Sequence, residues 1–316
     1  MKTLIALIAC CLSLAAQAQD YPTRLITIVV PFAAGSGSDT AARVIGQYLG
    51  PKLGQSIVVE NRVGVTGAIA STYVARSKLD GYTLLLGTNS THGSNSALYK
   101  SLTYDPVKDF VGIADTGVFN YFVVVNPALP IHSMAELVAY GKANPGKLSY
   151  AAGSSTSIVM AESFAKETGT ALLKIPYRSN PPALTDVMAG RVSLMFVDVS
   201  SAISFVKAGS LRALAVTTKA RSPLYPDLQT VDETVVKGFD LASWTGLFAP
   251  AGTPPAIVEK LNADVNAVLA TPEVKARLAS LGIEPAPMSA AEFTTYARGE
   301  VGKWSQLVKD AGIEPE

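Results

Sequence analysis

The sequence predicts a two-lobed α/β protein in which each lobe has a central, mostly parallel β-sheet flanked by helices. Short β-branched runs alternate with segments of helical period in the N-terminal half, and the same alternation recurs after residue 126. The chain then ends in three helical segments with clear start signals. A length of 316 residues also favours two domains over one large core.

The first lobe begins with an apolar strand over residues 25–30, which leads into a loop rich in Gly and Ser. A helix should follow this loop, because apolar residues recur at helical spacing at Ala41, Val44, Ile45, Tyr48 and Leu49. Strands expected over 56–60 and 83–86 flank a helix over 68–75. This alternation indicates a parallel sheet with right-handed crossovers.

The second lobe repeats the architecture, without a visible sequence repeat, from the apolar run 123–125. Further strands are expected over 148–151, 172–175, 194–197 and 211–217, and helices over 134–142, 160–167 and 183–189. The alternation of the two element types again favours a parallel sheet.

The C-terminal helices need a sheet to pack against. Their start signals are Pro254-Pro255, Thr271-Pro272 and the capping box Ser289 to Glu292. A return of the chain to the first lobe would supply that sheet. We therefore expect one lobe from residues 19–121 and 226–316, the other from 122–225, a hinge of two chain crossings, and a ligand cleft between the lobes.

The composition excludes several classes of protein. With 26 Lys and Arg against 25 Asp and Glu, the chain lacks the basic excess of a nucleic-acid binder, and 48% apolar residues are too many for a disordered chain. Two His and two Cys cannot build an ordinary zinc site. We therefore expect no metal, no cofactor and no nucleic acid.

Residues 1–18 have the features of a secretory signal peptide. Lys2 precedes an apolar run that ends in Ala16-Gln17-Ala18, so cleavage is expected after Ala18 and the mature protein is expected to be exported. Both cysteines leave with this segment, so the mature chain has no disulfide. Leu7 to Cys10 also resemble a bacterial lipobox, so lipidation of Cys10 is the less favoured alternative.

Ligands of open α/β sheets bind beyond the carboxyl ends of the strands, which directs attention to four loops. The first, residues 31–39 (PFAAGSGSD), leads from a strand into a helix, so its backbone N–H groups could face an anion. The alternative is a tight turn with Ser38 or Asp39 capping the helix. The second loop, residues 87–93, is dense in short polar side chains, and we interpret His92 as a hydrogen-bonding loop residue rather than a base.

The other two loops belong to the second lobe. Residues 152–157 place several hydroxyl groups before a helix, where they can donate to a carboxylate. Arg178 either binds a carboxylate through a bidentate hydrogen bond or lies in solvent. Asp198 either caps the next helix or selects a polar group of the ligand. No histidine follows His132 and no paired acids stand out, so the loops favour binding of a small anion over catalysis.

Many motifs of the mature chain occur in the order found in one receptor family. They include Ile28-Val29-Val30-Pro31-Phe32-Ala33-Ala34-Gly35, Val59-Glu60-Asn61-Arg62, Asp80-Gly81-Tyr82-Thr83-Leu84, Tyr104-Asp105-Pro106, Asn144-Pro145-Gly146-Lys147 and Trp244-Thr245-Gly246-Leu247-Phe248-Ala249-Pro250. The sequence thereby resembles the tripartite tricarboxylate transporter receptors, the Bug-type periplasmic solute-binding proteins.

The resemblance implies a type II periplasmic binding fold and a monomeric receptor that delivers an organic acid to a permease of one large and one small subunit. By matching positions, one ligand carboxylate is held by the first loop and the second lobe adds the serine-rich loop. The implied ligand-binding residues are Phe32, Ala33, Gly35 and Ser36, then Ser154, Ser155 and Thr156, with Asn89 and Asp198 lining the cleft. Arg178 joins this set from the residue analysis alone.

Departures from the family pattern bear on the ligand. Ser36 replaces a frequent Gly, Ile158 replaces a frequent His, and Arg178-Ser179 replaces Lys-Gly. The missing His and the presence of Ile158 favour an acid less polar than citrate, among di- or tricarboxylates, aromatic dicarboxylates and pyridine carboxylates. Two alternatives are a lyase or decarboxylase that would use Asp198 or His92, and a receptor that docks to a sensor kinase.

Overall fold

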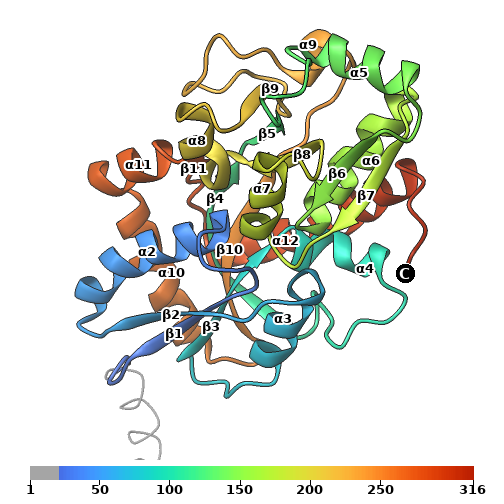
Figure 1. Ribbon diagram of the computed structural model, residues 1–316. Helices are drawn as coiled ribbons and strands as arrows, with labels where there is room; N and C mark the ends of the chain where they lie inside the picture. The colour runs from blue at the N-terminus through green and yellow to red at the C-terminus, as the bar shows by residue number, and fades with distance from the viewer. Residues whose placement is uncertain (1–20) are drawn as a thin grey trace, which may run out of the picture.

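The computed structural model describes residues 21–316, which form two β-sheets with helices on both faces of each sheet (Figure 1). The six-stranded first sheet has the order β11-β4-β10-β3-β1-β2, and the five-stranded second sheet has the order β7-β6-β8-β5-β9. The first sheet comprises β1 (Ile26–Val30), β2 (Ile57–Asn61), β3 (Thr83–Thr88), β4 (Phe110–Phe119), β10 (Ser243–Pro250) and β11 (Ile283–Glu284). The second comprises β5 (Tyr121–Val125), β6 (Leu148–Ala152), β7 (Leu172–Pro176), β8 (Leu194–Asp198) and β9 (Arg212–Val216).

Parallel pairing is confined to one half of each sheet. In the first sheet β1 pairs parallel with β2 and β3, and in the second β6 pairs parallel with β7 and β8; the remaining neighbours are antiparallel. The predicted two-sheet α/β fold is confirmed, but the expectation of mostly parallel sheets is wrong. The strands β4 and β10 were not predicted, because glycines and polar residues such as Asp115 and Thr116 interrupt their apolar pattern.

Alternate side chains of β1 determine which helices cover each face of the first sheet. Ile26, Ile28 and Val30 pack on the side of α2 (Gly37–Leu53) and α10 (Pro255–Leu269), whereas Val29 packs on the side of α3 (Ala68–Ala75) and α12 (Ala290–Asp310). The helix α11 (Pro272–Ala279) lies against α2. The C-terminal helices therefore pack on the first sheet.

The second sheet follows the same rule. Phe122 and Val124 of β5 face α7 (Asn180–Met188) and α8 (Val199–Lys207), while Val123 and Val125 face α5 (Met134–Ala143) and α6 (Ser155–Thr168). The short α9 (Val231–Thr234) follows β9 in the chain. The helix α6 begins at Ser155, five residues before the predicted start at 160, so part of the expected serine loop is its first helical turn.

The chain crosses between the sheets at two places. A single residue, Asn120, joins β4 to β5, and its carbonyl oxygen accepts a hydrogen bond of 2.9 Å from the N–H of Val199. The second crossing lies between β9 and β10, where Thr217 and Leu241 exchange hydrogen bonds of 3.0 and 2.6 Å. Backbone hydrogen bonds thus hold both connections, and the Thr217 hydroxyl adds a side-chain bond at the second.

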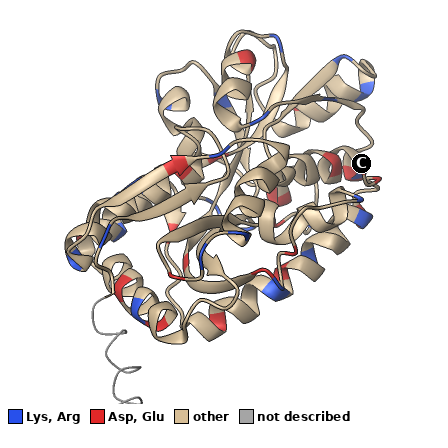
Figure 2. Ribbon diagram, turned by 90° about the horizontal axis from the view of Figure 1, so that it is seen from below, with Lys and Arg blue, Asp and Glu red and all other residues tan. Residues whose placement is uncertain are grey.

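The expected signal peptide, its cleavage site after Ala18 and the lipidation alternative at Cys10 lie outside the described residues. From residue 21 onward, none of the helices combines the length and apolar character needed to cross a membrane. Lys and Arg are interspersed with Asp and Glu over the ribbon (Figure 2), in keeping with the balanced charge of the sequence.

Two carboxyl groups are buried between the first sheet and α12. Glu300 accepts hydrogen bonds of 2.9 Å from the indole N–H groups of Trp244 and Trp304, which join the helix to β10. Asp115 of β4 is only 1% exposed, and its Oδ1 has no hydrogen-bond partner among residues 21–316. Burial raises the pKa of Asp115 to about 7, although the backbone N–H of Gly117 opposes the shift.

This burial predicts a pH-dependent stability that Asp115→Asn removes. A carboxyl whose pKa is higher in the folded than in the unfolded chain stabilises the fold fully below the unfolded value, and this contribution is lost as the pH rises through about 7. Relative to the variant, the wild type should lose about 2–3 kcal/mol of unfolding free energy between pH 5 and pH 8. Urea denaturation at both pH values measures this, and parallel pH profiles for the two proteins would contradict it.

Candidate functional site

Loops from both sheets meet around a cavity of about 30 Å³. Its lining consists of Phe32, Ser36, Gly37, Ser38, Thr88, Asn89, Ser90, Phe119, Tyr121, Ser154, Thr156, Asn180, Asp198, Ser243 and Thr245. The volume is far below the 300–1,000 Å³ of a usual small-molecule site. The loops of the two sheets therefore contact each other directly across the cavity.

Four helices begin at this cavity. Ser36 is the N-cap of α2, Ser154 of α6 and Asp198 of α8, and Asn180 is the first residue of α7. The positive ends of four helix dipoles consequently converge on one point. No Lys, Arg or His is among the residues that line the cavity. The donors at the cavity are therefore backbone, hydroxyl and amide groups, and the charged side chain in its lining is the carboxylate of Asp198.

Asp198 is held by four donors. Its Oδ1 accepts hydrogen bonds from the Ser200 hydroxyl at 2.5 Å and the Ser201 N–H at 2.8 Å, and its Oδ2 accepts from the Asn180 amide at 2.7 Å and the Ser201 hydroxyl at 2.9 Å. It therefore caps α8, one of the two roles left open by the sequence, and it also ties α7 to α8. These donors disperse its negative charge beside a cavity that favours anions.

Hydrogen bonds cross directly from one sheet to the other. The Asn89 amide donates to Thr156 Oγ1 at 2.6 Å, and the Ala33 N–H donates to Ser179 Oγ at 3.1 Å. The close approach of Gly37 adds a steric contact, because a Cβ at this position would lie 2.4 Å from Asp198 Oδ1. Only glycine permits the start of α2 to pack this tightly against the start of α8.

Six of the ten predicted site residues line the cavity, namely Phe32, Ser36, Asn89, Ser154, Thr156 and Asp198. Three others lie next to it. The N–H of Ala33 binds Ser179, the N–H of Gly35 binds Asp39 Oδ2 at 3.0 Å, and Ser155 Oγ donates to Asn95 Oδ1 at 2.5 Å. Ser36, rather than Ser38 or Asp39, caps α2.

Arg178 does not join this group. It lines a separate pocket of about 320 Å³ with Lys174, Tyr99 and the C-terminal Glu316. Ile158 lines the same separate pocket and not the cavity, so its apolar side chain does not bear on the polarity of a ligand there. The apolar walls of the cavity are instead supplied by Phe32 and Phe119.

Several cavity residues were not found from the sequence. Phe119, Tyr121, Ser243 and Thr245 come from strand ends beside the two crossings, whose positions depend on the unpredicted β4 and β10. Burial, and then the charge of Asp198, raise the pKa of Tyr121, so its hydroxyl stays protonated and can donate. The double proline after Asn180 was the available signal for a helix start at that residue.

His92 lies outside the cavity lining. Its ring stacks on Phe248 with centroids 3.9 Å apart, and its Nδ1 lies 3.0 Å from the Thr91 hydroxyl. Burial lowers the pKa of His92 to about 3, so the ring is neutral near pH 7. His92 lies in the short helical segment Ser90–Ser94 rather than in the expected loop, and its ring is packed in the interior. Within residues 21–316, no cluster of three or more His, Cys, Asp or Glu side chains could hold a metal ion.

Comparison with known proteins gives consistent matches over the chain. The sequence profile of the tripartite tricarboxylate transporter family receptor matches residues 41–313. Rpa4515 of R. palustris, solved with adipate, is 36% identical with a TM-score of 0.92, over 94% of this chain and 100% of that one.

Two further solved structures show the same fold. The periplasmic binding protein BugD is 34% identical with a TM-score of 0.89, over 94% of this chain and all of that one. MatC from Rhodopseudomonas palustris with bound malate is 32% identical with a TM-score of 0.86, over 91% and 100% of the two chains. The resemblance found from the sequence motifs is confirmed.

The four donors to Asp198 predict a large effect of Asp198→Ala on stability. The variant leaves the donors of Asn180, Ser200 and Ser201 without their acceptor and removes a helix cap, so it should lose about 3 kcal/mol of unfolding free energy. Ser133→Ala removes only the cap of α5 and should cost about 1 kcal/mol. Equal losses in urea denaturation would show that Asp198 acts as a cap alone.

Proposed function

The chain belongs to the tripartite tricarboxylate transporter receptor family, and we propose that it captures a small di- or tricarboxylic acid between its two sheets. Its relatives are periplasmic solute-binding proteins rather than enzymes. Neither side chain weighed for catalysis is suited to it, because Asp198 is occupied by four donors and His92 is buried outside the cavity. The proposal therefore concerns capture and delivery of a ligand.

The observation that carries the proposal is the convergence of four helix N-termini on one cavity without any cation. Such ends bind carboxylates through N–H groups and dipoles. The first loop would hold one carboxylate through the backbone from Phe32 to Ser36. Ser154, Thr156 and Asn180 would contact the acid from the second sheet. Rpa4515 with adipate and MatC with malate support this ligand class, since both acids are dicarboxylates.

Binding would require the loops to separate, because the cavity of about 30 Å³ is too small for such an acid. We assign the moving parts to residues 19–121 with 226–316, and to residues 122–225. Opening would break the bonds from Asn89 to Thr156 and from Ala33 to Ser179, and the acid would then occupy these polar groups. The two crossings, at Asn120 and between β9 and β10, are the proposed hinge.

Delivery completes the proposed role. The receptor would act as a monomer in the periplasm after cleavage behind Ala18, and would pass the acid to a permease of one large and one small subunit. The match to the transporter receptor family supports this part of the proposal. Docking to a sensor kinase remains the alternative partner, and the two are distinguished by whether loss of the receptor abolishes uptake or only induction.

A thermal-shift screen tests capture. Adipate, malate, citrate, terephthalate and pyridine dicarboxylate should include at least one acid that raises the melting temperature, because a ligand at 100 times its Kd adds about 2.7 kcal/mol of stability. Acetate serves as the monocarboxylate control, and it should have a smaller effect because it cannot reach both sheets. A melting temperature unaffected by all five acids would refute the proposed ligand class.

Thr156→Ala should weaken binding of the acid found in that screen. A lost hydrogen bond to a charged group costs about 1–3 kcal/mol, which corresponds to a roughly 5- to 150-fold rise in Kd. Isothermal titration calorimetry measures the change, and Ser133→Ala in the remote α5 is the control that should bind as the wild type does. If Thr156→Ala binds with unchanged Kd, the start of α6 does not contact the ligand.

A further inference from the structure

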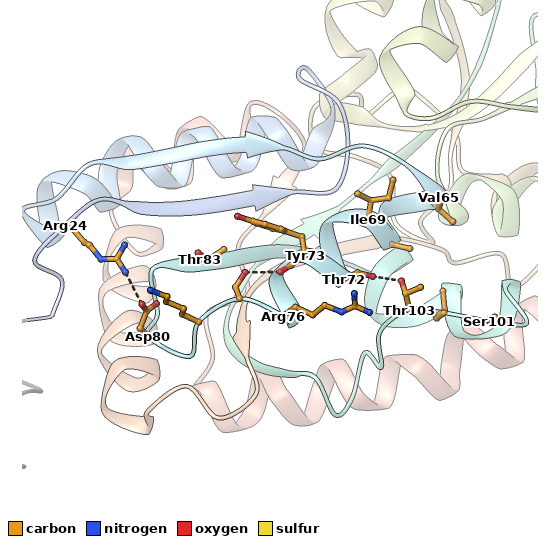
Figure 3. Close-up of a pocket in the computed structure, with 14 residues that line it drawn as sticks. Arg24, Val65, Ile69, Thr72, Tyr73, Arg76, Asp80, Thr83, Ser101 and Thr103 are labelled. Carbon is orange, nitrogen blue, oxygen red and sulfur yellow. Dashed lines mark hydrogen bonds and ion pairs between the residues drawn. The ribbon is translucent and has the colours of Figure 1, made fainter.

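A second hollow runs along α3 on the outside of the first sheet and shares no lining residue with the cavity between the sheets. Its volume is about 870 Å³, and it extends from the Arg24–Asp80 ion pair at one end to Val65 and Ser101 at the other (Figure 3). We call it the α3 groove. Its size admits several side chains of a partner.

The α3 groove carries three exposed apolar side chains. Ile69 and Tyr73 lie one turn apart on α3, and Val65 precedes the helix and lines the same groove, so the three form a stripe. Val65, Ile69 and Tyr73 are 56%, 49% and 40% exposed, and the Arg62 guanidinium stacks on the Tyr73 ring at 3.5 Å. The opposite side of α3 buries Ala70 and Val74 against the sheet. Single exposed apolar residues are ordinary, but a contiguous stripe beside a groove indicates a surface that another molecule covers.

The charges of the groove specify the chemistry of that molecule. Arg24, Arg76 and Lys78 line it together with a single carboxylate, Asp80, which pairs with Arg24 at 2.9 Å. Between residues 21 and 316, neither Arg76 nor Lys78 has an ion-pair partner, and both are exposed. An acidic protein segment with apolar side chains complements both features, the cations at the rim and the stripe on α3.

A strained turn leads into α3 and contributes Val65 to the groove. Gly64, Val65, Thr66 and Gly67 have successive φ values of 143°, 46°, 45° and 94°. Positive φ is unfavourable for any residue with a Cβ, and most of all for a β-branched residue such as Val65 or Thr66. Surrounding contacts must therefore hold this turn in place.

The residues that hold this turn also contact the loops around the cavity between the two sheets. Thr66 Oγ1 donates to Asn95 Oδ1 at 3.0 Å, and the Asn95 amide donates to the Thr66 carbonyl oxygen at 3.1 Å. The same Asn95 Oδ1 accepts a hydrogen bond of 2.5 Å from Ser155, the first residue of α6 beside the second sheet. Gly67 is also packed between two cleft loops, since a Cβ there would lie 2.7 Å from Thr91 and 2.8 Å from Pro31.

We propose that the α3 groove docks an acidic, apolar segment of the membrane partner, and that the turn at 64–67 makes the groove sensitive to closure of the cleft. The inference rests on the proposed function, because it takes the partner to be the permease. When the sheets separate, Ser155 leaves Asn95 and the turn loses part of its support. Val65 then shifts, so the segment recognises the groove best when the cleft is shut.

In-cell cross-linking tests the docking surface. A photoreactive p-benzoylphenylalanine at Ile69 should cross-link to a membrane protein, within an acidic segment identified by mass spectrometry. The same substitution at Leu173, an apolar side chain 57% exposed on the second sheet, is the control and should give no such product. Equal products at both sites, a product with a second copy of this chain, or a product with lipid alone would overturn the proposal.

Charge reversal gives a second measurement. Arg76→Glu with Lys78→Glu should reduce the Ile69 cross-link at least tenfold, whereas Lys142→Glu with Lys147→Glu, two exposed lysines of the second lobe, should not. Calorimetry with the five acids of the thermal-shift screen, on the same proteins, separates the two hypotheses. Cross-linking without acid binding would refute the proposed ligand class and support the docking surface. Acid binding without a cross-link would support the ligand class and refute the docking surface.

The link to the cleft is tested by Ser155→Ala. This variant removes the bond to Asn95 and leaves the bonds between Asn95 and Thr66 intact. The Ile69 cross-link should fall several-fold in this variant. An unchanged yield would show that the groove does not respond to the cleft, and would overturn that part of the proposal.

Discussion

The unpaired N–H groups at the starts of four helices are the constraint on which this structure depends. Each helix end carries partial positive charge, and burying it requires an acceptor. The side chains of Ser36, Ser154 and Asp198 each accept a hydrogen bond from one N–H of the helix that they cap. In the proposed function a small acid accepts hydrogen bonds from the remaining donors, so the site would need no cation.

The same constraint explains why contacts between the sheets are polar and short. Asn89 meets Thr156, and Ala33 meets Ser179, so hydroxyl and amide groups are paired across the cavity. Buried polar groups without partners are costly, so the close contact between the sheets is favourable because these groups are paired. Gly37 permits the approach, because no side chain separates α2 from Asp198.

The mixed sheets place these helix starts opposite each other. Because β4 passes into β5 through Asn120 alone, the end of one sheet lies directly beside the beginning of the other. The antiparallel strands β4 and β10 bring Phe119, Ser243 and Thr245 to the edge where the parallel strands end. On the other side of the ligand loops, the turn at 64–67 connects the cleft to the α3 groove through Asn95.

The sequence alone determined the alternation of strands and helices, because apolar periodicity and helix caps depend on neighbouring residues. The rule for ligand loops in α/β sheets selected the loops that contain six of the cavity residues, and the resemblance to the receptor family then named those residues. Tertiary structure decided the rest. The strands β4 and β10 lie inside the first sheet and depend on their neighbours, so Phe119 and Thr245, which belong to them, gave no local signal. Arg178 and Ile158, adjacent to predicted site loops, face a different pocket because the direction of a side chain depends on how a whole helix or strand end packs.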